Sequence, residues 1–135
     1  MLDHVTIGVS DLARSRGFYD AALVVIDVTC LHTAEAGFAG YGAGEQAFFW
    51  IGARPGAITG VRVAFAAASR ATVDRFHAAA LQAGGRDNGG PGPRPQYHPD
   101  YYGAFVLDPD GHNIEAVCHH STRPMNAAIV TAENM

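Results

Sequence analysis

Apolar and polar residues follow two periods along this chain, and these periods predict where strands and helices lie. The first stretch, residues 2–9, is rich in Val, Ile and Thr and predicts a strand. Residues 12–23 follow with apolar side chains at helical spacing, and Ser10 or Asp11 can cap that helix by accepting from free backbone N–H groups. Three further strands are expected in this half of the chain, over residues 24–32, 36–42 and 46–52.

The pattern then starts again. Residues 60–67 predict a strand, and residues 70–83 predict a helix that Ser69 can cap and Gly84-Gly85 can end. Dense Gly and Pro over residues 86–99 indicate a loop with a short strand at most. The last expected hairpin has its strands over residues 101–107 and 114–118, joined by the turn Asp108-Pro109-Asp110-Gly111.

A constant shift of 58 positions relates the two halves, since Val5 corresponds to Val63 and Phe18 to Phe76. Chance explains single matches among common apolar residues, but a match over a whole strand and helix without a gap favours duplication. We therefore predict an α+β fold of two tandem βαβββ modules, about residues 1–56 and 57–120, that form a curved mixed sheet around a cleft. They make one domain over residues 1–120, followed by a tail over 121–135. A cleft of this kind is a natural ligand site.

Composition and charge exclude some classes of function. The chain has 135 residues and a formal net charge of −4 without a basic run, which argues against nucleic acid as the partner. No apolar stretch is long enough to cross a membrane, and no signal peptide is visible. Cys30 and Cys118 lie far apart without a CxxC spacing, which favours reduced thiols and a cytoplasmic location.

Two segments of the chain are similar to a known family. The opening Asp3-His4-Val5-Thr6-Ile7-Gly8-Val9-Ser10-Asp11-Leu12 and the closing Leu107-Asp108-Pro109-Asp110-Gly111-His112-Asn113-Ile114-Glu115, with the repeat, resemble the vicinal oxygen chelate superfamily. This superfamily includes glyoxalase I, extradiol dioxygenases, fosfomycin-resistance transferases and bleomycin-resistance proteins. The resemblance covers roughly residues 2–120. It implies paired βαβββ modules and a divalent metal (Zn, Ni, Mn or Fe) that grips two substrate oxygens as a Lewis acid. We also expect a homodimer that binds a small molecule.

The resemblance assigns metal ligands to the first and last strands of the modules. His4 matches the first-strand histidine, and Glu115 matches the last-strand glutamate. The repeat places Arg62 opposite His4, where a second histidine is common, and arginine has no lone pair for a metal. Two protein ligands are fewer than the three of a typical tight site.

Each candidate residue has more than one interpretation. Glu115 can be a metal ligand, a general base or one half of an ion pair with Arg62. Arg62 can instead hold a carboxylate or enolate substrate in place of the metal's charge. His4 can be a ligand, a base or a hydrogen-bonded structural histidine. After the Gly/Pro loop comes a cluster of Tyr97, His98, Tyr101 and Tyr102. His98 can complete a metal set or transfer a proton there, or the cluster can be a surface loop whose tyrosines pack on the sheet.

These observations predict a small-molecule cleft and leave enzyme status open. If the protein is an enzyme, it resembles glyoxalase-type lyases, isomerases or dioxygenases with an incomplete metal-ligand set. The alternative is a non-catalytic protein of the bleomycin-resistance type that sequesters a ligand in an aromatic cleft.

Overall fold

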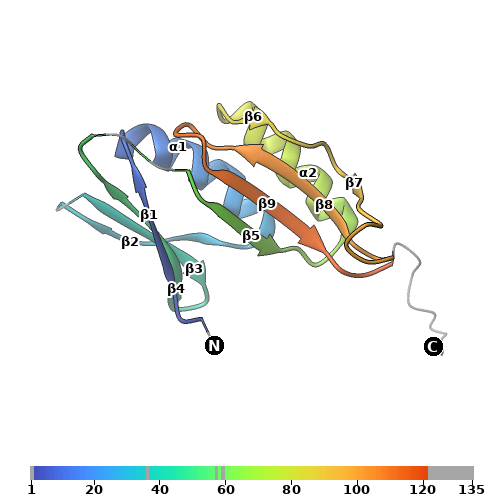
Figure 1. The fold of residues 1–135 in the computed structure, drawn as a ribbon. Helices are drawn as coiled ribbons and strands as arrows, with labels where there is room; N and C mark the ends of the chain where they lie inside the picture. Colours follow the sequence, from blue (N-terminus) through green and yellow to red (C-terminus); the bar gives the residue numbers. More distant parts are fainter. Residues whose placement is uncertain (1, 36, 57, 59, 122–135) are drawn as a thin grey trace.

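Two βαβββ-like modules lie side by side in the computed structural model of the chain, which describes residues 2–35, 37–56, 58 and 60–121 (Figure 1). The first module contains β1 (Val5–Val9), α1 (Leu12–Leu23), the 3₁₀ turn η1 (Val24–Ile26), β2 (Thr29–Ala34), β3 (Phe38–Ala43) and β4 (Gln46–Ala53). Its strands form a first sheet in the order β1-β4-β3-β2, in which β1 runs parallel to β4 and the other pairs are antiparallel.

The second module repeats this arrangement. It contains β5 (Arg62–Ala66), α2 (Arg70–Gln82), β6 (Arg86–Asp87), β7 (Gly92–Pro93), β8 (Tyr102–Leu107) and β9 (Asn113–Cys118). Its second sheet has the order β5-β9-β8-β6, with β7 also paired to β8 and with β5 parallel to β9. The predicted fold class is confirmed, and each module builds a mixed sheet of its own. The predicted tail falls mostly on residues 122–135, which lie outside the described residues.

The two helices begin at equivalent points of the repeat. Asp11 caps α1 through a bond from the Arg14 N–H to its Oδ1 (3.0 Å), and Ser69 caps α2 through a bond from the Thr72 N–H to its Oγ (3.1 Å). Both caps have extended backbone angles, as an N-cap requires. The shift of 58 positions therefore holds for the cap, the first helical turn and the strand before it.

The strand predicted over residues 24–32 is wrong in its first part. Val24–Ile26 continues from α1 as a 3₁₀ turn, and Asp27 ends the turn with a left-handed φ of 63°. Ile26 and Val28 are buried in the core, so their burial overrides the strand preference of this β-branched run. The strand itself starts at Thr29.

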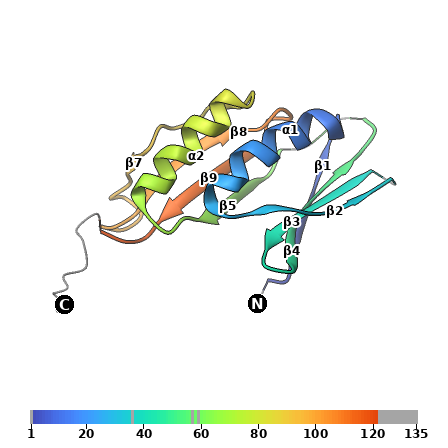
Figure 2. The ribbon, with the colours of Figure 1, turned by 180° about the vertical axis from the view of Figure 1, so that it is seen from behind.

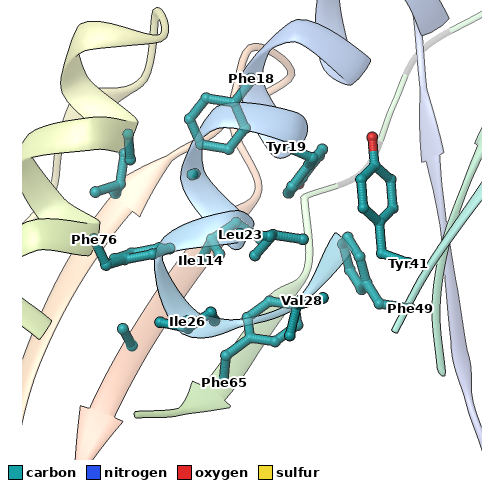
Figure 3. Packing of buried hydrophobic residues seen from close by; sticks show 14 of the residues in the cluster. Phe18, Tyr19, Leu23, Ile26, Val28, Tyr41, Phe49, Phe65, Phe76 and Ile114 are labelled. Carbon is teal, nitrogen blue, oxygen red and sulfur yellow. The ribbon is translucent and has the colours of Figure 1, made fainter. Parts of the chain in front are cut away.

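One hydrophobic core runs through both modules. The helices α1 and α2 pack together in front of the second sheet, as Figure 2 shows from the helix side, and α1 also contacts β2 and β4 of the first sheet. Aromatic side chains cross the module boundary in this layer (Figure 3): the Phe49 ring lies 5.1 Å from Tyr19 and 5.1 Å from Phe65, in both cases edge to face. Such contacts add to the free energy of burying large rings, so neither module buries its core alone.

Side chains of the turn before β9 connect the two modules through buried hydrogen bonds. Asp108, which is 1% exposed, accepts a hydrogen bond from the Tyr19 hydroxyl at 2.6 Å. His112, also 1% exposed, accepts from the Val61 N–H at Nδ1 (3.0 Å), so its Nε2 carries the proton and donates to the Gly8 carbonyl (2.8 Å). This neutral tautomer links β1 of the first module to the turn of the second.

Both cysteines are free thiols, with Cys118 buried and Cys30 half-buried. Among the described residues, no helix has the length and apolar character needed to span a membrane.

Candidate functional site on the uncovered faces of the sheets

The face of the second sheet that points away from the helices carries Arg62 and Glu115. Ile114 and Ala116 are fully buried in the core, so the alternating Glu115 points to the opposite face of β9. Arg62 pairs with Asn113, and Ala64 pairs with Glu115, which places Arg62 and Glu115 on the same face, one diagonal step apart. The predicted proximity of these two side chains follows from this register.

A small hollow lies between these side chains. It has a volume of about 110 Å³ and is lined by Arg62, Val63, Ala64, Asn113 and Glu115. Arg62 is exposed, and the ion pairs of the described residues do not include one with Glu115, so the ion-pair interpretation is not realised in the structure. A positive and a negative side chain thus line the same hollow without neutralising each other.

Glu115 is bound by Tyr101, which the sequence grouped with His98 and Tyr102 but did not assign to the site. The Tyr101 hydroxyl donates a short hydrogen bond to Glu115 Oε2, and Glu115 is only 8% exposed. Burial, together with this bond, raises the pKa of Tyr101 to about 12, so the phenol stays a donor at neutral pH. Gly103 makes room for the pair, because a Cβ at this position would lie 3.0 Å from Glu115 Oε2.

Three rings hold Tyr101 in place. Tyr97, His98 and His119 approach the Tyr101 ring edge to face, with centroids at 4.8, 5.4 and 5.3 Å. His98 Nδ1 accepts from the Asp100 N–H (3.1 Å), so its Nε2 carries the proton and donates to His119 Nδ1 at 2.8 Å. The predicted site residue His98 therefore lies beside Tyr101, and Tyr101 lies between His98 and Glu115.

Tyr102 lies on the other side of the sheet. Its hydroxyl donates to Asp74 Oδ1 of α2 at 2.6 Å, and the Arg70 guanidinium lies 4.9 Å from its ring centroid. The structure thus brings Tyr101 rather than Tyr102 to Glu115. Strand alternation could have identified Tyr101 as the partner. Side chains an even number of residues apart lie on the same face of a strand, and Tyr101 is four residues from Phe105, which pairs with Glu115.

The uncovered face of the first sheet carries His4 and aromatic side chains. His4 is exposed, and its Nδ1 lies 2.7 Å from Asp3 Oδ1. It lines a larger, mostly apolar hollow of about 460 Å³ between the first sheet and β5, together with Phe48. Trp50, on the neighbouring strand β4, pairs with Thr6 and has its ring parallel to that of His32.

The two predicted metal ligands do not form a complete set in one chain. Within the described ranges, no group of three or more His, Cys, Asp and Glu side chains could hold a metal ion. Glu115 Oε2 is engaged by Tyr101, and His4 and Glu115 line different hollows. The described residues of a single chain thus do not fit a three-ligand metal, and the chemistry below is derived from side chains alone.

Comparison with known proteins agrees with this fold. The profile described as "Glyoxalase/Bleomycin resistance protein/Dioxygenase superfamily" matches residues 1–116. No curated protein matches the sequence. A glyoxalase/bleomycin resistance protein from Albidiferax ferrireducens T118 is 31% identical, with coverage of 87% of this chain and 98% of that chain and a TM-score of 0.77.

Two more distant structures share the fold. A glyoxalase-related enzyme from Fulvimarina pelagi is 18% identical, with coverage of 94% of this chain and 93% of that chain and a TM-score of 0.70. A lactoylglutathione lyase from Agrobacterium tumefaciens is 16% identical, with coverage of 87% and 92% and a TM-score of 0.64. At these identities the similarity extends to the fold alone.

Proposed function

Because the chain belongs to the Glyoxalase/Bleomycin resistance protein/Dioxygenase superfamily, we propose that it binds a small carbonyl compound in the hollow between Arg62 and Glu115 and transfers a proton on it. Members of this superfamily bind small molecules, and the superfamily includes lyases and isomerases of the glyoxalase type. The observation that supports the proposal is a buried carboxylate and a cation that line one hollow without forming an ion pair with each other.

Glu115 is suited to act as the base. Tyr101 donates to its Oε2, and no described side chain donates to Oε1, which leaves one oxygen to take a proton from the ligand. The bond from Tyr101 also fixes the orientation of the carboxylate, and an oriented base transfers protons more efficiently than a mobile one. In the proposed step, Glu115 removes a proton from the carbon next to the carbonyl, and the electron pair of that C–H bond moves onto the carbonyl oxygen.

Arg62 is suited to stabilise the charge that develops on that oxygen. It is a permanent cation with several N–H donors, and the described part of the chain offers it no carboxylate partner. A donor that is already in place when charge develops lowers the barrier of such a step. The proton then returns from Glu115 to the ligand, so atoms and electrons balance without a further reactant.

The experiment is proton exchange in D₂O followed by ¹H NMR, with a panel of small 2-oxo and 2-hydroxycarbonyl compounds. The wild-type protein should remove the C–H signal next to the carbonyl of the compound that it binds. Glu115→Gln should abolish exchange and keep binding, and Arg62→Ala should weaken both. Arg86→Ala is the matched control, because Arg86 is an exposed arginine of β6 outside the hollow.

Other outcomes decide between the alternatives. Binding that depends on Arg62 but leads to no exchange would contradict the enzymatic step and favour a ligand-sequestering protein. Exchange that survives Glu115→Gln would contradict the assignment of the base.

We also propose that the protein is a homodimer and that a partner's side chains complete the incomplete metal set. Superfamily members often bind divalent metals, and the uncovered face of the second sheet, which carries Glu115, is available to a second chain. Sedimentation shows the oligomeric state, and elemental analysis after loading with Zn, Ni, Mn or Fe shows the metal content. A monomer that retains no metal would contradict this part of the proposal.

A further inference from the structure

Trp50 lies flat on the uncovered face of the first sheet. A Cβ built at Gly40, its neighbour on β3, would lie 2.7, 2.7 and 2.8 Å from three consecutive atoms of the six-membered ring of Trp50. A point at equal distances from three consecutive ring atoms lies above the centre of the ring. One face of the indole therefore covers Gly40, and the opposite face is turned away from the sheet.

His32 extends this flat surface from the other side of Gly40. The rings of His32 and Trp50 are parallel within 7°, and their centroids are 5.8 Å apart, which is a sideways-displaced stacked arrangement. Register explains the arrangement, because Gly40 pairs with both residues, with His32 on β2 and with Trp50 on β4. The ring contacts of the described residues give Trp50 no other aromatic partner.

A cation lies further along the same face. Gly52 pairs with Gly8, and the aliphatic part of Arg54 crosses Gly8 at 3.1 Å from the position of a Cβ. Gly52 is two residues beyond Trp50, which corresponds to about 7 Å along a strand. Phe38, which is 43% exposed, lies over Gly52 and continues the apolar surface. Because Gly8, Gly40 and Gly52 have no side chains, the side chains of Arg54, Trp50 and Phe38 can lie flat on this face of the sheet. Arg54 places a positive charge at one end of the resulting surface.

We propose that the surface formed by Trp50, His32 and Phe38, with Arg54 at its end, is a binding site for a planar aromatic ring system that carries an acidic group. Trp50 is half-buried, with the outer face of its indole turned away from the sheet. Such a flat ring face is a favourable stacking partner for another π-system, and offset stacking requires a planar ligand. The arginine selects for a ligand with a negative charge. This inference goes beyond the proposed function, because the site does not require Arg62 or Glu115.

Trp50 reports on this site directly, because it is the only tryptophan of the chain. Its indole N–H gives a single side-chain signal in a ¹H–¹⁵N spectrum. Titration with naphthalene-2-carboxylate should shift this signal and saturate. Decahydronaphthalene-2-carboxylate, which has the same charge but is saturated and not planar, should bind on the order of tenfold more weakly, since a stacking contact is worth about one factor of ten.

Three variants test the parts of the site, and a fourth is a control. Gly40→Ala keeps the indole but displaces its ring, and Trp50→Leu removes the ring; both should weaken binding of naphthalene-2-carboxylate on the order of tenfold. Arg54→Ala should weaken binding of the carboxylate but leave binding of neutral 2-naphthamide unchanged. Gly17→Ala is the matched control for Gly40→Ala, because a Cβ at Gly17 meets nothing within 4 Å. Circular dichroism confirms that each variant is folded.

Three outcomes would overturn the proposal. The first is equal affinity for the planar and the saturated acid. The second is unchanged affinity in a folded Trp50→Leu protein, measured by isothermal titration calorimetry because this variant lacks the reporting indole. The third is an indole signal that moves on dilution without any probe, which would mean that a second copy of the chain covers this face. Glu115→Gln and Arg62→Ala should leave the affinity unchanged, so failure of the proposed proton transfer is distinguishable from failure of this site.

Discussion

Trp50 and Glu115 occupy equivalent positions in the two modules. Trp50 pairs with Thr6 in the parallel pair of the first sheet, and Glu115 pairs with Ala64 in the parallel pair of the second. Thr6 and Ala64 are related by the same 58-position shift that relates the helices. Both modules thus present a side chain from the same point of the last strand to the uncovered face, but one is an indole and the other a carboxylate.

The same divergence separates His4 from Arg62, which are also related by the repeat. As a consequence, the two uncovered faces have different chemistry. The first sheet offers flat rings and a histidine, and the second offers a carboxylate and a guanidinium. A ligand that extends over both faces would meet an aromatic surface on one module and charged groups on the other.

Loss of the His112 side chain, which joins the two modules, should destabilise the folded protein. His112→Ala removes the partner of the Val61 N–H and of the Gly8 carbonyl and leaves a cavity. We expect the free energy of unfolding to fall by about 2–4 kcal/mol, measured by urea denaturation. His120→Ala, at an exposed histidine, is the control and should change it by less than about 0.5 kcal/mol. Equal losses in the two variants would contradict the role of His112.

The raised pKa of the buried Tyr19 hydroxyl should make the stability of the protein depend on pH in the alkaline range. Burial and the nearby Asp108 carboxylate raise the pKa of Tyr19 well above its ordinary value of 10.0. Its neutral form is therefore favoured in the folded state. The resulting stabilisation is complete below pH 10.0 and is lost as the pH rises above this value toward the folded-state pKa.

The test compares the wild-type protein with Tyr19→Phe. The free energy of unfolding of the wild type should fall more steeply above pH 10.0, because the phenylalanine of the variant has no proton to lose. At neutral pH, Tyr19→Phe should cost about 1–3 kcal/mol through the unpaired Asp108 oxygen. Parallel pH dependences of the two proteins would refute the prediction.

The Tyr101–Glu115 bond depends on the missing side chain of Gly103. Gly103→Ala should displace the Tyr101 hydroxyl and cost about 1–3 kcal/mol in unfolding free energy. In the Gly103→Ala background this bond is already broken, so Tyr101→Phe should lower the free energy of unfolding less than it does in the wild type. The double-mutant cycle should therefore show a coupling energy above about 0.5 kcal/mol. Additive losses would show that Gly103 does not support this bond.

The two equivalent helix caps, Asp11 and Ser69, should contribute similar amounts to the free energy of unfolding. Asp11→Ala and Ser69→Ala each remove a side-chain acceptor from the first turn of a helix, at a cost of about 1 kcal/mol. Asp11→Asn keeps an acceptor oxygen and should cost much less. Thermal and urea unfolding check both values, and an Asn variant as unstable as the Ala variant would argue against a capping role.

Local signals in the sequence were enough for the helices and for the repeat. The predicted helix over residues 12–23 coincides with α1, and the helix predicted over 70–83 ends one residue earlier, at Gln82. Caps, helical spacing and a glycine stop all act within a few residues of the chain. The hairpin of β3 and β4 was predicted for the same reason, since Gly44 supplies the positive φ of its turn.

Tertiary packing decided the details of the site. In a regular strand Cys30 and His32 would face the same side, but the irregularity between them in β2 places Cys30 opposite Tyr41 and His32 opposite Gly40. This puts His32 on the uncovered face beside Trp50, a contact that strand alternation alone would not predict. Register shifts of this kind depend on pairing with a distant strand, so the local sequence carries no signal for them.

The sequence by itself determined the α+β class, the duplicated modules and the presence of Arg62 and Glu115 near each other. These follow from periodicity, from the 58-position shift and from the similarity to a known family. Only the tertiary structure decided that Tyr101 holds Glu115, that Arg62 lines the same hollow without an ion pair to Glu115 and that Trp50 lies flat on Gly40. The physical reason is range: helices and turns are stabilised within a few residues, whereas these contacts arise where segments far apart in the chain pack together.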